Sequence, residues 1–437
     1  MILTHLGAEK TVTGSCHLLQ VKGLNILVDC GLAQGADHCL PIEEWPLPCP
    51  EIDFLFLTHA HIDHIGRVPE LIRNGFRGEI ITTHATKALL SPMLQNALSF
   101  QDMDKGERSK ILGSIDELSW GFEYQQKFDL KNGVRFSLGR AGHILGSCFI
   151  RFELDSPSYS VVFSGDLGAR NTPLVPDPDI PDPCDFLVLE STYGNRRHED
   201  RKDRIRKLGE VLTHALADGG KVFIPAFSLG RVQELLFEMD RLFSDPKWQE
   251  VFPDLQGKST VPVFLDSPLG LRITEIMSSL SPYWDKEAQR ILRKGDHPLD
   301  FDHLYAVRSH HEHMKLLEMD GPTVIIAGSG MCSGGRIVDH LKAGLKDPRN
   351  DVLFVGYQAE GTPGRDIIRY AENPNRFVQI DGESVPIKAG VHVLSGYSAH
   401  ADQDGLVEWV QSMPKKPEQI KLVHGEPAAQ KGLNECL

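Results

Sequence analysis

The segment Leu57–His64 constrains this chain more than any other part of the sequence. It reads Leu-Thr-His-Ala-His-Ile-Asp-His and places four strong metal ligands within six residues, directly after an apolar run. Imidazole and carboxylate groups both suit zinc. Side chains two residues apart in an extended segment point to the same side, so His59 and His61 can share one ion. Asp63 and His64 follow where the chain turns into a helix, and they can face a second ion.

The composition, 41% hydrophobic and 24% charged over 437 residues, fits a globular protein with one large core or two linked ones. No run approaches the ~20 uncharged apolar residues that span a bilayer. The opening MILTHLGAEK lacks the basic and apolar segments of a secretory signal, so we expect a cytoplasmic protein without membrane association. The eight cysteines form no C-x-x-C pair, which predicts reduced, buried thiols.

The net charge of −14 disfavours loose adhesion to nucleic acid or anionic lipid. An enzyme of this charge that acts on nucleic acid must therefore gather its basic residues in one groove.

The rhythm of apolar runs changes twice along the chain. Up to about residue 196, short strands stand at close spacing, with helical patterns at Val68–Asn74 and Thr86–Phe100. The strands expected there are Ile2–Leu6, His17–Val21, Asn25–Asp29, Asp53–Leu57, Val134–Leu138, Cys148–Leu154, Ser160–Ser164 and Phe186–Glu190. From about residue 381, short strands return at Val391–Leu394 and Gln419–Val423, around a helix at about Gln403–Ser412.

Between residues 197 and 380, strands alternate with helices. Strands are expected at Lys221–Pro225, Val261–Leu265, Thr323–Ala327 and Val352–Val355, and helices are expected from Ser228, Pro268 and about Ser333. Parallel strands need long crossovers, so this alternation predicts a parallel α/β sheet covered on both faces.

The pattern H-x-H-x-D-H resembles the signature of the metallo-β-lactamase superfamily, and further motifs of that family occur at their expected places. Asp29 in ILVDCG matches the acidic residue that closes an early strand, and His143 in AGHILGS and Asp166 in SGDLG match the third and fourth metal motifs. The resemblance implies an αββα sandwich with two Zn²⁺ ions, in which Asp29 orients a ligand from behind. The resemblance implies that one ion is held by His59, His61 and His143 and the other by Asp63 and His64. Asp166 would bridge the two ions.

Three more segments resemble the β-CASP branch of the superfamily, the nucleases of RNA processing and DNA repair. Glu190 in LVLESTYGNR, His400 in GYSAHAD and His424 in LVHGEP match its three extra motifs. The last histidine ligand, His424, then lies 424 − 166 = 258 residues beyond Asp166. The resemblance therefore implies a metallo-β-lactamase domain made of residues 1–196 and 381–437, with residues 197–380 as an inserted β-CASP domain. The chain most resembles compact prokaryotic ribonucleases of this branch.

The resemblance implies an RNA phosphodiesterase whose two zinc ions clamp the attacking and leaving oxygens. In the family His400 donates a proton to the leaving 3′ oxygen, and Glu190 holds its ring and favours the imidazolium. The expected substrate is single-stranded RNA, cleaved endonucleolytically or from the 5′ end to leave a 5′-phosphate and a 3′-hydroxyl. The catalytic set is His400, Glu190, Asp63 and Asp29.

The inserted domain is expected to hold the substrate phosphates. The Gly-rich segment Gly328–Gly335 opens a helix, so its backbone N–H groups could cradle an anion, although a plain tight turn explains it equally well. The candidate phosphate contacts are Ser329, Gly330, Arg231, Arg336 and Arg365. Each of these arginines could equally well be a solvated surface charge that does not contact phosphate. The run His310, His311 and His313 has no fourth ligand nearby, so we expect no third metal site there.

Three other functions stay open. A β-CASP DNA nuclease is disfavoured by His424, because the DNA-directed branch tends to carry an apolar residue at that motif. A metallohydrolase acting on a thioester, lactam or lactone does not account for Glu190, His400 and His424 together. A catalytically silent RNA-binding scaffold would have lost metal ligands, and this chain retains all seven. The sequence also leaves open a homodimer, and manganese or iron in place of zinc.

Overall fold

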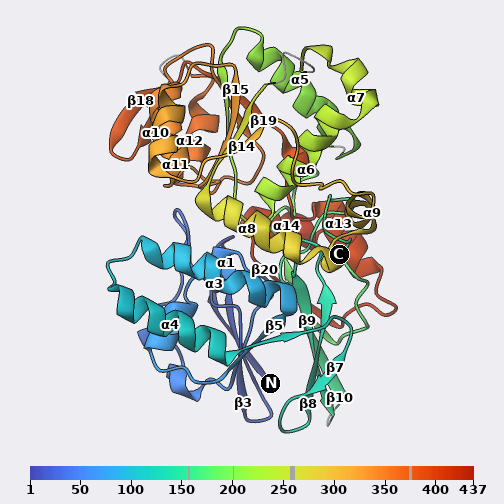
Figure 1. The fold of residues 1–437 in the computed structure, drawn as a ribbon. Helices are drawn as coiled ribbons and strands as arrows, with labels where there is room; N and C mark the ends of the chain where they lie inside the picture. The colour runs from blue at the N-terminus through green and yellow to red at the C-terminus, as the bar shows by residue number, and fades with distance from the viewer. Residues whose placement is uncertain (156–157, 200, 256–260, 374–375) are drawn as a thin grey trace. The chain divides into compact units, whose positions relative to one another are not determined.

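The computed structural model describes residues 1–155, 158–199, 201–255, 261–373 and 376–437 (Figure 1). They form two compact units, one of residues 1–197 with 400–437 and one of residues 198–399. The chain thus returns to the first unit at His400, whereas the sequence predicts the return near residue 381. The strand β19 (Gly390–Val393) accounts for the difference, because it pairs with β16 (Asp351–Phe354) in the sheet of the second unit. Within the described ranges, no helix is long and apolar enough to cross a membrane.

Two six-stranded sheets build the first unit. The first has the order β1-β2-β3-β4-β5-β6, with strands Ile2–Gly7, Cys16–Val21, Leu24–Val28, Phe54–Phe56, Glu79–Thr83 and Ser119–Phe122. The second has the order β20-β11-β10-β9-β8-β7, where β7 to β11 are Lys127–Asp129, Val134–Arg140, Cys148–Asp155, Ser158–Phe163 and Phe186–Glu190, and β20 is Gln419–Val423. Phe56 of the first sheet meets Phe136 and Phe152 of the second edge to face, inside one core that both sheets share. The sheets therefore pack face to face.

Helices cover the outer faces of both sheets. On the first sheet they are α1 (Ile62–Ile65), α2 (Val68–Arg73), α3 (His84–Ser99) and α4 (Lys105–Leu118), and on the second α13 (Gln403–Gln411) and α14 (Pro427–Asn434). α3 and α4 contact β5, while Trp409 and Leu433 pack against Leu187 and Leu189 of β11. Two short 3₁₀ turns, Ile42–Glu44 and Cys49–Glu51, lie between β3 and β4. The expected αββα sandwich is confirmed.

The sequence pattern missed α4 and the short strands β5, β6 and β7. α4 buries only Ile111 and Ile115, so its apolar stripe is too thin to show as a helical period. Its start is marked instead by Asp104, whose carboxylate accepts from the backbone N–H groups of Gly106 and Glu107.

The second unit is built on a sheet with the order β14-β13-β15-β12-β16-β19, and every pairing in it is parallel. Its strands besides β16 and β19 are β12 (Lys221–Pro225), β13 (Val263–Asp266), β14 (Leu304–Ala306) and β15 (Thr323–Ala327), and a hairpin adds β17 (Phe377–Ile380) and β18 (Glu383–Pro386). The helices are α5 (Arg204–Leu216), α6 (Arg231–Ser244), α7 (Pro246–Val251), α8 (Pro268–Ser279), α9 (Lys286–Arg293), α10 (His310–Glu318), α11 (Arg336–Gly344) and α12 (Pro363–Tyr370). Short 3₁₀ turns stand at Arg201–Asp203, Pro253–Leu255, Ser281–Tyr283 and Ser395–Tyr397. The expected parallel α/β sheet is confirmed.

Two of these helices begin later than the sequence predicts. α6 begins at Arg231 rather than Ser228, and α11 begins at Arg336 rather than Ser333. The residue before each helix is a glycine with φ of +88° or +74°, in the left-handed region that favours glycine. The glycine therefore sets the first helical residue.

The last strand of the first unit carries the C-terminal residues back to the N-terminal part of the chain. β20 pairs in parallel with β11, with Val423 opposite Glu190, and Figure 1 shows the red strand beside the green one. His424 follows β20 directly, so this pairing decides where its imidazole lies.

Candidate metal centre

The predicted ligands lie in segments that follow strand ends of the first unit. His59 and His61 follow β4, Asp63 and His64 lie in α1, His143 follows β8, Asp166 follows β10 and His424 follows β20. Two glycines make the close approaches possible. A Cβ at Gly31 would lie 1.6 Å from the carbonyl oxygen of Asp63, and one at Gly168 would lie 1.8 Å from that of Gly142. Gly168 also forms a β-bridge with His400, which places that histidine beside the ligands.

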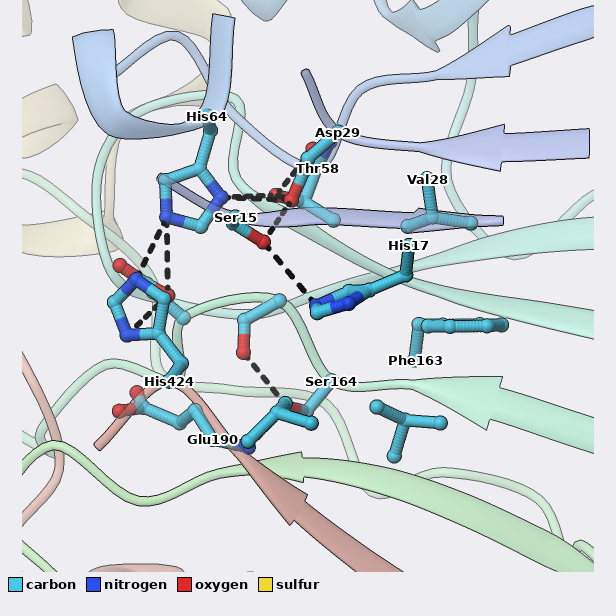
Figure 2. Close-up of a pocket in the computed structure, with 14 residues that line it drawn as sticks. Ser15, His17, Val28, Asp29, Thr58, His64, Phe163, Ser164, Glu190 and His424 are labelled. Carbon is cyan, nitrogen blue, oxygen red and sulfur yellow. Dashed lines mark hydrogen bonds and ion pairs between the residues drawn. The ribbon is translucent and has the colours of Figure 1, made fainter. Parts of the chain in front are cut away.

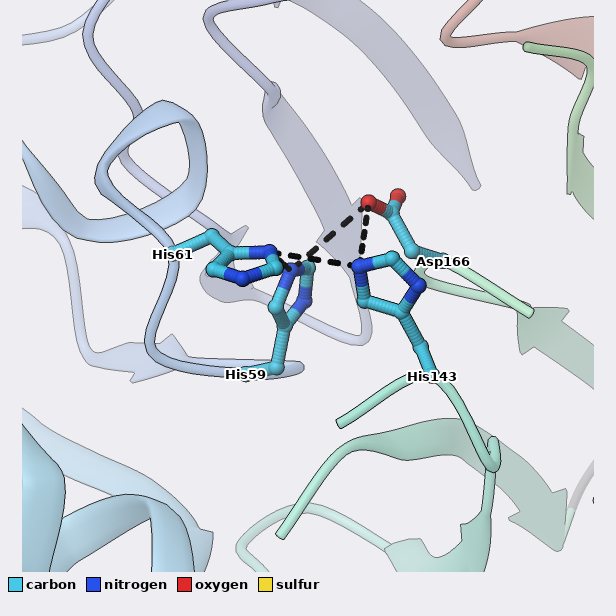
Figure 3. A group of neighbouring side chains, drawn as sticks. All are labelled: His59, His61, His143 and Asp166. Atoms are coloured by element: carbon cyan, nitrogen blue, oxygen red, sulfur yellow. Dashed lines mark hydrogen bonds and ion pairs between the residues drawn. The ribbon is translucent and has the colours of Figure 1, made fainter. Parts of the chain in front are cut away.

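The first ligand group consists of His59, His61, His143 and Asp166 (Figure 3). Nδ1 of His61 lies 3.1 Å from Nε2 of His59 and 3.2 Å from Nε2 of His143. Oδ2 of Asp166 lies 3.6 Å from both of those Nε2 atoms. Four donors at 2.0–2.2 Å around a tetrahedral zinc stand about 3.3–3.6 Å apart, so the spacing of this group fits one ion.

The second ligand group consists of Asp63, His64 and His424. Nε2 of His64 lies 3.2 Å from Nε2 of His424 and 3.9 Å from Oδ2 of Asp63. The other carboxylate oxygen of Asp166, Oδ1, lies 3.4 Å from Nε2 of His64. Asp166 thus turns one oxygen to each group, which is the geometry of a bridging carboxylate.

The proton positions around three of the histidines also fit metal binding. Thr58 donates its hydroxyl to the carboxylate of Asp29, so its oxygen accepts from Nδ1 of His59 at 3.1 Å. Thr192 donates to the carbonyl of His424 and accepts from Nδ1 of the same residue at 3.1 Å. Nδ1 of His64 donates to Oδ2 of Asp29 at 2.7 Å. Each proton on Nδ1 leaves the lone pair on Nε2, the atom that faces the proposed metal.

Asp166 is the buried anion of this centre. Its Oδ1 makes no hydrogen bond within the residues that the structure describes, and its side chain is buried. Burial raises the pKa of Asp166, but the imidazoles of His424, His64, His400 and His59 outweigh it and hold that pKa well below its ordinary value. A buried carboxylate oxygen without a hydrogen-bond donor fits a cation as its partner.

His400 stands beside the ligands and forms a further group of facing ligand atoms with Asp166 and Glu190. Its Nδ1 lies 3.2 Å from both carboxylate oxygens of Glu190, and its Nε2 lies 3.8 Å from Oδ2 of Asp166. Burial disfavours the charged imidazole, yet Glu190 and Asp166 raise the pKa of His400 to about 9. Glu190 is itself fixed, because it accepts from the backbone N–H groups of Leu167 and Thr192. His400 can therefore carry a proton at neutral pH.

Asp29 and His424 adopt backbone conformations that are uncommon for residues other than glycine. Their φ angles are +59° and +51°, in the left-handed region. Such conformations cost about 1–3 kcal/mol each and persist where the surroundings hold them. Here the hydrogen bonds of Thr58 to Asp29 and of Thr192 to His424 do so.

The candidate phosphate contacts all lie in the second unit. Arg231 pairs with Glu234, Arg336 with Asp266, and Arg365 with Glu360. Ser329 and Gly330 lie in the loop after β15, where the hydroxyl of Ser329 accepts from the backbone N–H of Ser333. Each of the three arginines thus already has a carboxylate partner.

The run His310, His311 and His313 does not come together as a cluster. His310 and His311 are exposed, whereas the buried His313 meets Asp266 and His340. Oδ2 of Asp266 lies 2.6 Å from Nδ1 of His313 and 2.7 Å from Nε2 of His340. These are hydrogen-bond distances, shorter than the 3.1–3.9 Å between donors of the two ligand groups. The cluster is a hydrogen-bonded network that sequence reasoning missed, because its members come from three separate elements.

Three family models match successive parts of the chain. The model of the metallo-beta-lactamase superfamily matches residues 10–212, and that of the Beta-Casp domain matches residues 232–367. A model described as a Zn-dependent metallo-hydrolase RNA specificity domain matches residues 384–437. The three models together cover most of the chain.

Several curated proteins are similar over nearly the whole chain. Ribonuclease TTHA0252 of Thermus thermophilus is 37% identical over 98% of this chain and 93% of its own length. Transcription termination factor FttA of Methanocaldococcus jannaschii is 31% identical over 97% of this chain and 67% of its own. Cleavage and polyadenylation specificity factor 73 of Drosophila melanogaster is 30% identical over 96% of this chain and 59% of its own length. A solved structure of a protein of unknown function from Enterococcus faecalis covers 97% of this chain and 93% of its own at TM-score 0.52 and 13% identity, a likeness of fold alone.

Proposed function

Because this chain belongs to the β-CASP branch of the metallo-β-lactamase superfamily, we propose that it is a metal-dependent ribonuclease that hydrolyses the RNA backbone. The observation that carries the proposal is the position of Asp166, with one oxygen toward each ligand group and His400 within 3.8 Å. A phosphodiesterase needs a centre that neutralises charge on the phosphoryl group and a nearby proton donor for the leaving oxygen. The name of the ribonuclease from Thermus thermophilus supports RNA as the substrate.

The two ligand groups would hold two Zn²⁺ ions, which supply a water ionised at neutral pH and charge neutralisation at the phosphate. His59, His61 and His143 would hold one ion, Asp63, His64 and His424 the other, and Asp166 would bridge them. Asp29 keeps the proton of His64 on Nδ1, so that its Nε2 stays available to the metal. Asp63 would serve as a ligand of the second ion and add negative charge to the centre.

His400 acts as the general acid. Glu190 binds its Nδ1, so the second proton of the imidazolium is on Nε2, the atom that lies toward Asp166. From there the proton passes to the leaving 3′ oxygen, which is otherwise a poor leaving group. Cleavage therefore leaves a 3′-hydroxyl on one fragment and a 5′-phosphate on the other.

We place the proposed phosphate contacts in the second unit at Ser329 and Gly330. They stand at the carboxyl end of β15 in a parallel sheet, where open α/β sheets bind their ligands. Arg231, Arg336 and Arg365 would add positive charge only by sharing it with their carboxylate partners, so we give them a supporting role.

The compartment and the assembly of the chain stay predictions. The eight cysteines are all free, seven of them buried or partly buried, which supports the reducing cytoplasm. Single-stranded RNA as the form of the substrate and a homodimer as the assembly are likewise predictions.

The proposed function is tested by mapping products on one RNA strand labelled at the 5′ end and at the 3′ end, beside a DNA strand of the same sequence. We expect RNA to be cut much faster than DNA, with 5′-phosphate and 3′-hydroxyl ends, and a chelator to abolish cleavage until zinc is restored. The position of the cuts separates endonucleolytic from 5′-exonucleolytic cleavage. Ends carrying 2′,3′-cyclic phosphate would contradict hydrolysis by a metal-activated water. Faster cleavage of DNA would favour the alternative, a β-CASP DNA nuclease.

A further inference from the structure

A series of hydrogen bonds leads from His64 through Asp29 to Ser15 and His17, two residues that the proposed chemistry does not use. Oδ2 of Asp29, which accepts from His64, also accepts from the hydroxyl of Ser15 at 3.3 Å. That hydroxyl lies 3.4 Å from Nε2 of His17, and Nδ1 of His17 lies 3.0 Å from Nδ1 of His5. Figure 2 shows Asp29, Ser15 and His17 in sequence behind His64.

The hydrogen bonds between Asp29 and His5 allow only one arrangement of donors and acceptors. An ionised Asp29 only accepts, so Ser15 donates to it and must itself accept from Nε2–H of His17. A neutral His17 then has its lone pair on Nδ1, which accepts from Nδ1–H of His5. Burial is the main cause that lowers the pKa of His17 well below its ordinary value, which keeps the ring neutral at pH 7. Every proton therefore points toward Asp29.

The surroundings of His17 leave it little freedom. It is 3% exposed, and its ring stacks on Phe163 at a centroid distance of 6.3 Å. Ser15 and His17 line a cavity of about 20 Å³, whose wall also includes Asp29, His64 and His424. A polar ring held in a mainly apolar core, one serine away from Asp29, needs a reason other than packing.

We propose that Ser15 and His17 are positioning residues for the second ligand group. Oδ1 of Asp29 is fixed by the backbone N–H of Thr58 at 2.8 Å. Oδ2, the oxygen that accepts from His64, also accepts from the hydroxyls of Thr58 at 2.9 Å and Ser15 at 3.3 Å. Ser15, oriented by His17, keeps that oxygen aimed at Nδ1 of His64, and His64 in turn presents Nε2 to the metal. We expect the larger effect at the second ligand group, because Asp29 bonds His64 directly and reaches His59 only through the hydroxyl of Thr58.

This inference rests on the proposed ligands but not on RNA as the substrate. It is tested with His17→Leu and the matched variant His17→Gln, because leucine and glutamine are close in size and only glutamine retains an N–H donor. The measurement is the zinc content of the full chain during titration with a chelator, read with a zinc-sensitive dye. We expect His17→Leu to release one of its two zinc ions at about tenfold lower chelator strength, the lower end of the range for residues behind metal ligands. His17→Gln should release its zinc close to the parent chain.

Ser15→Ala provides a second path to the same result. It should lower the affinity for the same zinc ion. In the double variant Ser15→Ala/His17→Leu, the affinity should fall no further than in the more affected single variant, because both residues act through Asp29. Phe136→Leu, in the core that both sheets share, is the control for packing. It should lower the melting temperature of the metal-free chain without changing either zinc affinity.

Three results would overturn the proposal. The first is equal zinc release from His17→Leu and His17→Gln, and the second is equal weakening of both zinc ions. The third is a zinc loss that follows the melting temperature across all variants, Phe136→Leu included. If His17→Leu does not fold, His17→Gln and Ser15→Ala decide the outcome. A parent chain that binds no pair of zinc ions would instead refute the ligand assignment itself, so the two failures are distinguishable.

Discussion

His400→Ala is expected to lower the rate of RNA cleavage by roughly 10²–10⁴-fold while both metal ions stay bound, the usual worth of general acid–base catalysis. The imidazole is tied to Glu190 through Nδ1 and lies 3.8 Å from the nearest oxygen of Asp166, so its removal takes away no proposed ligand. Burial lowers the pKa of this imidazole, but the charge of Glu190 raises it and favours the protonated form. What is lost is the proton for the leaving 3′ oxygen.

The same variant separates proton donation from simple substrate binding. On an activated aryl phosphodiester, whose leaving group needs no proton, the loss should be much smaller than on RNA. Glu190→Gln should act in the same direction but more weakly, because it removes only the charge that supports the imidazolium. His84→Ala is a matched control, since His84 pairs with Glu123 at 3.8 Å outside the metal centre. Equal losses on both substrates, or loss of zinc from His400→Ala, would show that His400 has another role.

Asp166→Ala is expected to weaken both metal sites at once and to abolish cleavage at ordinary zinc concentrations. Residues that stand behind ligands are worth about 10–100-fold in metal affinity, and Asp166 faces both groups directly, so we expect more than about 100-fold at each site. The variant also leaves the imidazoles of His59, His64 and His143 without their shared anion. The zinc affinity of Asp166→Asn should lie between those of the parent chain and Asp166→Ala, because asparagine retains one oxygen but loses the charge.

The measurement is equilibrium dialysis against buffered zinc, followed by elemental analysis. Asp155→Ala is the control, because Asp155 is an exposed carboxylate of the same unit, paired with Arg135. Loss of one ion with the other held at unchanged affinity would mean that Asp166 belongs to one group alone. Two ions held as tightly as in the parent chain would remove it from the centre.

The local part of the candidate metal centre can be predicted from sequence because it needs little tertiary structure. His59, His61, Asp63 and His64 share one strand end, and the turn into α1 alone brings them together. The αββα sandwich and the parallel sheet likewise follow from the period of the apolar runs. His424 is different, since only the pairing of β20 with β11 carries it to His64, and no local pattern encodes that pairing. His424 can be identified from sequence only by the resemblance of its motif, LVHGEP, to that of a known family.

Other features could not be predicted because they depend on packing between distant elements. The return to the first unit at His400 follows from the pairing of β19 with β16. The network of Asp266, His313 and His340 joins the end of β13 to two helices. Thr58 and Thr192, which fix the tautomers of His59 and His424, carry no sequence signal beyond standing next to a motif residue. The carboxylate partners of Arg231, Arg336 and Arg365 also appear only in the folded chain.

We propose that one carboxylate, Asp166, joins two metal sites on the first unit. Anomalous diffraction at the zinc absorption edge, on crystals of the zinc-loaded chain, tests it most directly. We predict two peaks about 3.5–4 Å apart, one among His59, His61 and His143 and one among Asp63, His64 and His424, with one oxygen of Asp166 toward each. A single peak, or two peaks that do not share Asp166, would contradict the account.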